Sequence, residues 1–220
     1  SWSPDGRWLA FESYREGNLD VYVMGTGGRE LHAITTDPAA DYAPAWAHEG
    51  QALAFTSLRE GSKDIFVRML EGQEAVVNVT QSPDVDEDKP SWSTDGSRLA
   101  YVTGPQGQTS VDVAFFDWES LSADRAQTEF FGTGDSPAWA PDGESLVYVH
   151  TRGGRSHLVA ASMTGWALFH EVFSVEGLLD GIAWTDSPVS PRVIARAEEV
   201  LAGGGGEREP LSFYAEIVQP

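Results

Sequence analysis

The 220-residue sequence contains no cysteine, which excludes disulfide bonds and thiolate metal sites. It has no apolar run near the ~20 residues that a membrane-spanning helix needs, and no signal peptide is recognisable in it. Basic residues are scarce, since 14 lysines and arginines stand against 34 aspartates and glutamates, for a net charge of −20. Such a surface repels phosphate backbones, so we expect no nucleic-acid binding and favour basic partners or cations.

What the sequence does contain is a repeat. The segment Trp2–Gly6 (WSPDG) returns at Trp46–Gly50, Trp92–Gly96 and Trp139–Gly143, and a degenerate copy begins at Trp184. The tryptophans are 44, 46, 47 and 45 residues apart (46−2, 92−46, 139−92, 184−139). A period in the forties, with four short strands in each period, is typical of the blades of a β-propeller.

Each repeat predicts the order strand, tight turn, strand, loop, strand, turn, strand. The four strands of the second repeat are expected at Ala45-Trp46, Ala52–Ser57, Asp64–Met69 and Ala75–Thr80, where β-branched and aromatic residues gather. The third repeat carries an insertion at Asp117–Ala126 to which the sequence assigns no purpose.

The sequence therefore predicts an all-β fold, a β-propeller of four-stranded antiparallel blades in a single domain over residues 1–220. Four blades are expected at about 1–36, 37–82, 83–132 and 133–176, with a degenerate fifth at 177–220. Because the first residues already lie inside a repeat, we expect the chain to be incomplete at its N-terminus. We also expect its parent ring to have six or seven blades.

The recurrent tryptophans and turn glycines have a structural explanation. A large ring at one equivalent point of each repeat fills the gap between neighbouring sheets, so core packing is favoured over ligand stacking. Glycine in the turn permits a tight reversal of the chain. The residues concerned are Trp2, Trp46, Trp92, Trp139 and Trp184, and Gly6, Gly50, Gly96 and Gly143.

A second recurrence combines an arginine with a carboxylate. Arg15 and Asp20 stand four and nine residues after the aromatic residue of the second strand in repeat 1, and Arg59 and Asp64 stand likewise in repeat 2. Repeat 3 lacks both charges. This joint presence and loss predicts an ion pair within the blade that braces the loop between strands two and three. Repeat 4 keeps Arg152 without the carboxylate, which makes this arginine the most available to an anionic partner.

Carboxylates gather in the linkers that lead into each first strand. In a propeller these linkers share a rim with the loops between strands two and three, where converging charge attracts cations or basic peptides. The candidate binding residues are Asp41, Asp86, Glu87, Asp88, Asp135, Arg152 and Asp180.

The acidic linkers raise the question of metal binding. Aspartate and glutamate oxygens suit calcium, but their spacing lacks the twelve-residue calcium-loop pattern, so a solvated charged rim is the simpler interpretation. The five histidines show no zinc spacing, and neither a GxSxG motif nor a phosphate-binding loop is present. We predict no catalytic residue, no metal and no cofactor, with calcium kept as an open alternative.

The repeated pattern PxWSPDGxxLAFxSxRxGxxD[IV][YF]V resembles the WD40-like repeat PD40 of the TolB-like β-propeller superfamily. Ser1–Val23 and Pro44–Val67 match it closely, whereas Pro90–Tyr101 and Pro137–His150 match its first half. The resemblance implies a propeller that binds proteins or peptides, often outside the cytoplasm. TolB itself docks a peptidoglycan-associated lipoprotein and a colicin segment on its propeller.

Three functions follow as hypotheses. The leading one is a non-enzymatic scaffold that binds a protein or peptide, with a periplasmic or extracellular location. The second is the substrate-gating propeller of a prolyl-oligopeptidase-family serine peptidase whose catalytic domain lies outside this chain. The third is a carbohydrate- or cation-binding propeller. Fold alone does not distinguish them, because one propeller architecture serves many functions. The sequence does not indicate an oligomeric state.

Overall fold

The computed structural model describes residues 1–71, 75–105, 108–163 and 169–182, with only the backbone described at 125–129 and 131. The chain divides into two compact units, Ser1–Trp184 and Thr185–Pro220, and every described residue belongs to the first. In this part of the chain every element is a β-strand, so it has no helix that could cross a membrane. The all-β prediction is confirmed.

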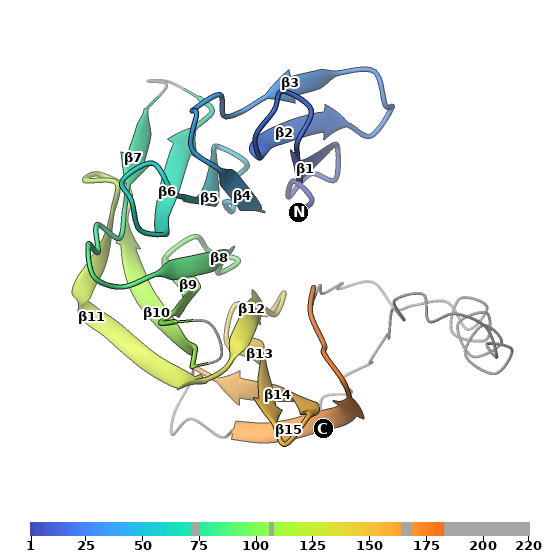
Figure 1. The fold of residues 1–220 in the computed structure, drawn as a ribbon, viewed down its shortest axis with the longest axis vertical. Coiled ribbons are helices and arrows are strands. Elements are labelled where there is room, and N and C mark those ends of the chain that lie inside the picture. Colours follow the sequence, from blue (N-terminus) through green and yellow to red (C-terminus); the bar gives the residue numbers. More distant parts are fainter. Residues whose placement is uncertain (72–74, 106–107, 164–168, 183–220) are drawn as a thin grey trace, which may run out of the picture. The chain divides into compact units, whose positions relative to one another are not determined.

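The strands form four antiparallel sheets in chain order (Figure 1). The first sheet contains β1 (Trp8–Ser13), β2 (Asp20–Gly25) and β3 (Leu31–Ala33). The second contains β4 (Asp41–Trp46), β5 (Ala52–Ser57), β6 (Asp64–Met69) and β7 (Val76–Asn78). The third contains β8 (Glu87–Trp92), β9 (Arg98–Thr103), β10 (Ser110–Asp117) and β11 (Ser122–Thr133). The fourth contains β12 (Asp135–Trp139), β13 (Ser145–Arg152), β14 (Arg155–Ser162) and β15 (Phe169–Glu176).

Each sheet is a meander in which sequential strands pair. The second, third and fourth sheets have the four antiparallel strands that were predicted, whereas the first has three. The bounds of β5 and β6 agree with the sequence prediction to the residue, because their apolar runs are flanked by turn-forming residues. The predicted insertion at Asp117–Ala126 mostly extends the β10–β11 hairpin, whose tip is 118–121. The blade boundaries and the ring size stay predictions, and most of the predicted fifth blade (183–220) lies outside the described residues.

Apolar side chains fill the space between consecutive sheets. Val21 and Phe55 belong to the cluster that joins the first two sheets. Ile65 and Trp92 belong to the cluster that joins the second and third sheets, and a further cluster contains Trp139 and joins the third and fourth. Because full burial of such a side chain contributes roughly 1.5–3 kcal/mol, these layers account for the stacking of one sheet on the next.

The tryptophans differ in burial according to what covers them. Trp92 is 7% exposed and Trp139 is 6% exposed, and both lie between sheets. Trp46 is half-buried against the first cluster. Trp2 pairs with Leu9 and is 61% exposed, since the described part of the chain places no preceding sheet over it.

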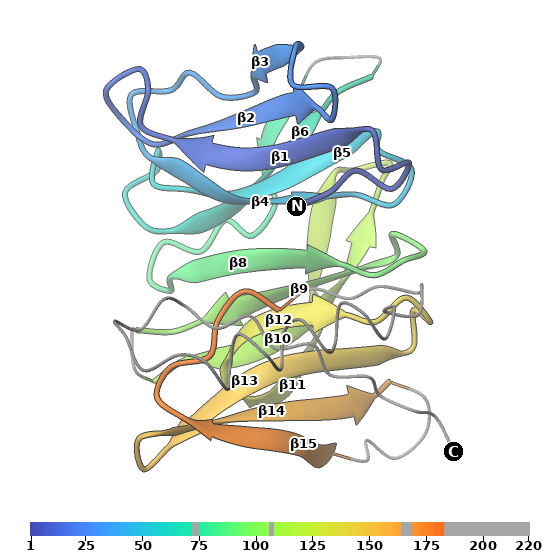
Figure 2. The same cartoon turned by 90° about the vertical axis from the view of Figure 1, so that its right-hand side faces the viewer.

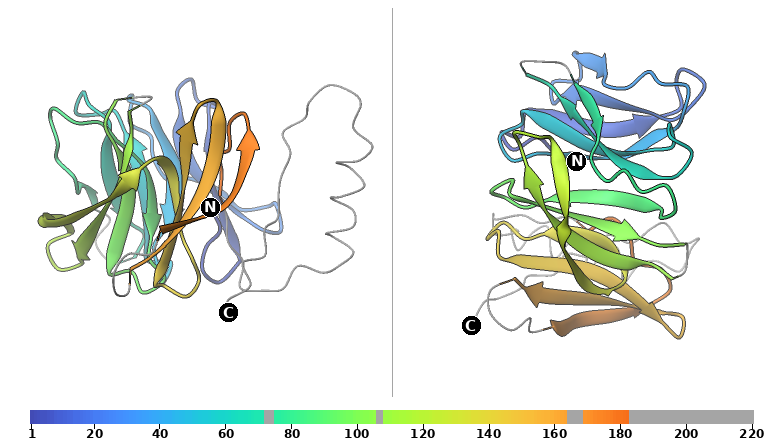
Figure 3. Two further views of the ribbon diagram at one scale, coloured as in Figure 1. Left: turned by 90° about the horizontal axis from the view of Figure 1, so that it is seen from below. Right: turned by 90° about the vertical axis from the view of Figure 1, so that its left-hand side faces the viewer.

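The first strands β4, β8 and β12 follow one another along one side of the four sheets, which faces the viewer in Figure 2. The view from the other side in Figure 3 shows the outer strands, with β11 prominent. Segments that precede the first strands in different repeats are therefore neighbours in space, which positions the candidate site.

The turn glycines do more than reverse the chain. Gly143 has φ 70, and a Cβ added to it would stand 2.5 Å from Thr94 Oγ1 of the preceding repeat's turn. Gly50 and Gly96 likewise lie close to the third residue of the preceding turn, Pro4 and His48 respectively. Glycine at this position thus permits both a left-handed backbone and close stacking of consecutive turns.

We predict that Gly143→Ala lowers the free energy of unfolding by about 2–3 kcal/mol, because alanine is strained at this φ and its Cβ meets Thr94. Gly6→Ala is the matched control, since Gly6 has φ 67 and nothing within 4 Å of an added Cβ, so strain alone should cost about 1 kcal/mol. Urea unfolding measures both. Equal losses in the two variants would contradict a role for the contact between turns.

Candidate functional site

The first strands of the second, third and fourth sheets begin with polar residues at one edge, which we call the inner rim. Its members are Asp41–Ala43, Glu87–Lys89, Asp135-Ser136 and Asp180-Gly181. Each group stands three to five residues before the tryptophan of its repeat, so the repeat itself places these groups at equivalent positions.

A β-bulge with a left-handed residue marks the inner rim in the second, third and fourth sheets. Ala43, Lys89 and Ser136 have φ of 50, 52 and 51, and each lies where the pairing of its strand shifts register. Gly181 has φ 72 at the same position of the next repeat. Such a conformation costs of order 1–3 kcal/mol in a non-glycine residue, and a bulge re-aims the neighbouring side chains.

The carboxylate of Asp88 joins the second and third sheets. It accepts hydrogen bonds from Lys63 Nζ at 2.9 Å, from Thr56 Oγ1 at 3.0 Å and from Tyr42 Oη at 3.4 Å. Burial, followed by the charge of Asp88, raises the pKa of Tyr42 to about 12, so this hydroxyl stays a donor at neutral pH. Burial acts to lower the pKa of Lys63, but the contact with Asp88 outweighs it and the pKa is raised.

Lys89 joins the third and fourth sheets to the segment that follows β15. Its ammonium lies 2.7 Å from Asp135 Oδ1, 3.1 Å from Ser136 Oγ and 3.2 Å from Asp180 Oδ1. The Ser136 hydroxyl lies 2.5 Å from Asp180 Oδ1 and 3.0 Å from Asp135 Oδ1, so its one proton can be donated to either carboxylate. For Asp180, the hydrogen bond from Ser136 and the charge of Lys89 outweigh burial and lower the pKa of the carboxyl. One cation therefore serves two carboxylates.

The predicted pairing of Arg15 with Asp20 and of Arg59 with Asp64 is wrong, because each arginine contacts a different carboxylate. Arg59 donates through Nη2 to Oδ1 and Oδ2 of Asp41 at 3.1 and 2.9 Å, and its guanidinium lies 4.6 Å from the centre of the Phe66 ring. Asp41 is fully buried, and this burial raises the pKa of its carboxyl although Ser57 and Arg59 oppose the effect. Arg59 thus pairs with the start of β4 in its own sheet rather than with Asp64.

Asp64 and Asp20 instead hold the segment that follows the last strand of their own sheet. Asp64 accepts from the backbone N–H of Ser82 at 2.9 Å, and Asp20 accepts from the Thr35 hydroxyl at 3.1 Å. Arg15 lies 3.9 Å from the carboxylate of Glu16 on the surface, so it does not pair with Asp20.

The remaining predicted site residues are less closely connected. Asp86 accepts from the backbone N–H of Lys63 at 3.2 Å, and Glu87 is buried at the start of β8. Arg152 is exposed at the end of β13. Trp184 lies outside the described residues.

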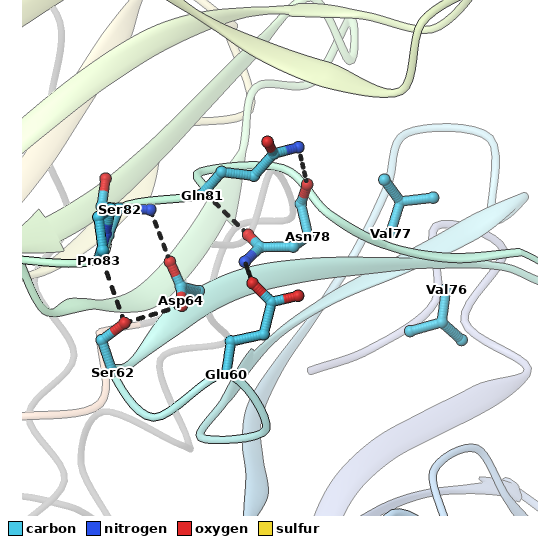
Figure 4. A pocket seen from close by; sticks show the side chains of 9 residues that line it. All are labelled: Glu60, Ser62, Asp64, Val76, Val77, Asn78, Gln81, Ser82 and Pro83. Atoms are coloured by element: carbon cyan, nitrogen blue, oxygen red, sulfur yellow. Dashed lines mark hydrogen bonds between the residues drawn. The ribbon is translucent and has the colours of Figure 1, made fainter.

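A polar pocket of about 470 Å³ lies beside the β5–β6 loop and the linker after β7 (Figure 4). Its residues bond to one another: Asn78 Nδ2 donates to the Glu60 carboxylate at 2.9 Å, and Gln81 Nε2 donates to the backbone carbonyl of Asn78 at 3.0 Å. Ser62 donates to Asp64 at 3.1 Å. These mutual bonds hold the linker that leads to the inner rim.

Metal binding gains no support from the geometry. Within the described ranges, no three histidine, aspartate or glutamate side chains come together in a way that could hold a metal ion. Calcium binding stays a prediction.

Comparison with known proteins identifies the family. The family described as "TolB beta propeller domain" (PD40) matches residues 1–187. The chain belongs to the TolB β-propeller family. It is 51% identical over 35 residues to the Tol-Pal system protein TolB of Syntrophus aciditrophicus (strain SB), a match that covers 16% of this chain and 8% of that protein.

Solved structures agree with this assignment. TolB from Acinetobacter baumannii has a TM-score of 0.62 and 25% identity, over 77% of this chain and 41% of that one. A puromycin-hydrolysing peptidase of Mycobacterium tuberculosis shares the fold at 18% identity and a TM-score of 0.56, over 78% of this chain and 27% of the peptidase. The chain thus spans less than half the length of these relatives.

In this TolB-type propeller, sequence reasoning missed the lysines and the bulges of the inner rim. Lys63 and Lys89 are not among the predicted site residues, because the prediction rested on the carboxylates of the linkers and on the recurrent arginines. The sequence does contain an indication of the bulge. Proline follows the left-handed residue at Pro44, Pro90 and Pro137, and proline within a sheet is confined to edge strands and bulges.

We predict that Ala43→Gly raises the free energy of unfolding by about 0.5–1 kcal/mol, because glycine adopts φ 50 without strain. The control is Ala45→Gly in the same strand, where glycine should destabilise by about 1 kcal/mol through lost packing and added freedom. Urea unfolding of both variants measures these changes in the free energy of unfolding. A loss at Ala43 as large as that at Ala45 would contradict the left-handed bulge.

Proposed function

We propose that this TolB-type propeller is a non-enzymatic binding platform whose inner rim recognises a protein or peptide with basic residues. The observation that carries the proposal is the network around Lys89, in which one ammonium is shared by Asp135 and Asp180. The side chains of these two aspartates are 41% and 69% exposed, so a second cation supplied by a partner can reach them.

The backbone of the rim supports this proposal. The bulges fix the side chains before a partner arrives, and side chains that are already ordered lose less conformational entropy on binding. The ladder formed by Lys63, Asp88, Lys89 and Asp135 crosses three sheets, which suits an extended ligand that lies across blades. Charge-assisted hydrogen bonds to carboxylates favour lysine or arginine in that ligand.

The family relationship also supports a binding role. The curated relative is named as a protein of the Tol-Pal system. We extend to this chain the periplasmic or extracellular location that the resemblance implies. The whole protein's partner and its chemistry remain part of the proposal, because the chain spans only part of its relatives.

The test is a selection of phage-displayed peptides on the purified chain, followed by calorimetric titration of those enriched. We predict that the enriched peptides are basic. The double variant Asp135→Asn/Asp180→Asn should lower the affinity for these peptides about tenfold, which corresponds to about 1.4 kcal/mol. Glu119→Gln on the exposed β10–β11 tip is the control and should change nothing.

Two outcomes would contradict the proposal. Enriched peptides that bind the double variant as tightly as the parent would move the site away from the inner rim. Hydrolysis of the peptides by the purified chain would refute the non-enzymatic role.

A further inference from the structure

A second pocket lies between the first two sheets, at the opposite end of the first strand from the inner rim. It has a volume of about 630 Å³, within the 300–1,000 Å³ typical of ligand sites. Trp46 closes β4 at this end, whereas Asp41 begins β4 at the inner rim. The apolar residues of the lining include Trp8, Trp46 and Leu70, and the His32 ring lies 5.9 Å from that of Trp8.

The next gap along the chain shows what such a space accommodates. Between the second and third sheets, the indole of Trp118 stacks on Trp92 with 5.2 Å between ring centres and an angle of 19°. It also meets the ring of Phe116 edge-on at 4.8 Å, and its Nε1 donates to the carbonyl of Gly96 at 3.0 Å. An aromatic ring thus seals this gap from within the protein.

The two gaps are equivalent by repeat position. Trp46 corresponds to Trp92, and Leu70 corresponds to Phe116. Leu70 donates its backbone N–H to the carbonyl five residues after Trp46, at 2.8 Å. Phe116 donates its own to the carbonyl five residues after Trp92, at 2.9 Å. Two residues after Leu70, where the third repeat has Trp118, the sequence has Gly72. At this position the second repeat therefore has no side chain that corresponds to Trp118.

The charges around the pocket are mostly negative. Of the Asp, Glu, Lys and Arg residues that line it, Asp5, Glu49 and Glu71 carry carboxylates, and Arg68 carries the one positive charge. All three carboxylate residues are exposed. A partner with cations next to its apolar group would thus be favoured electrostatically.

We propose that this pocket binds one aromatic side chain, tryptophan by preference, from a partner peptide or protein with lysine or arginine beside it. The ring takes the place that Trp118 occupies in the next gap and stacks against Trp46, while the flanking cations face Glu49 and Glu71. This site is separate from the inner rim, so it does not depend on the function proposed there.

The test uses ¹⁹F NMR on the full chain, with acetyl-Gly-Lys-Trp-Lys-Gly-amide containing 5-fluorotryptophan as the probe. We expect the probe to bind, and the unlabelled tryptophan peptide to displace it at least about ten times more effectively than the same peptide with alanine. The Glu49→Gln/Glu71→Gln variant should weaken the probe about three- to fivefold and leave the binding of N-acetyltryptophanamide unchanged.

Leu70→Trp fills the pocket from within and should abolish binding of the probe. Circular dichroism shows whether this variant folds. If it does not fold, the affinity of the Glu49→Gln/Glu71→Gln variant for the probe tests the proposal instead. Equal displacement by the alanine and tryptophan peptides would overturn the proposal, as would unchanged probe binding in the glutamine variant. Asp135→Asn/Asp180→Asn is the control for the inner rim and should leave the probe's affinity unaltered.

Discussion

Burial of one large aromatic ring between consecutive sheets is the interaction on which the rest of this structure depends. Trp92 and Trp139 are almost fully buried at equivalent positions, and each belongs to a cluster drawn from two sheets. Their indole N–H groups have no hydrogen-bond partner within the described residues, so the rings contribute through apolar burial and not through a polar contact. A sheet too small to bury its own face gains a core from its neighbour.

This stacking also creates the candidate site. Because each ring fixes one sheet against the next, the starts of β4, β8 and β12 become neighbours although they are far apart in sequence. The left-handed residue three positions before each tryptophan then turns the polar side chains to the same rim. Lys89 can bridge Asp135 and Asp180 only because three successive repeats are held in register. The platform therefore depends on the core.

Much of the fold could be predicted from the sequence, since the spacing of the tryptophans and the apolar runs such as Ala52–Ser57 are local patterns. The ion pairs could not. Arg59 is five residues from Asp64, yet it binds Asp41, eighteen residues away at the start of β4. The spacing of residues along the sequence does not reveal which carboxylate the fold brings close to Arg59. Nor does it reveal that the Asp64 carboxylate accepts a hydrogen bond from the backbone N–H of Ser82. The acidic linkers indicated where the rim lies, but not that lysines neutralise part of it.

The most direct test of the central claim compares Trp92→Ala with Trp2→Ala by urea unfolding. The two residues share one repeat position, but Trp92 is 7% exposed between sheets and Trp2 is 61% exposed. The account predicts a loss of about 3–5 kcal/mol in the free energy of unfolding for Trp92→Ala and less than about 1 kcal/mol for Trp2→Ala. Similar losses in the two variants would contradict it.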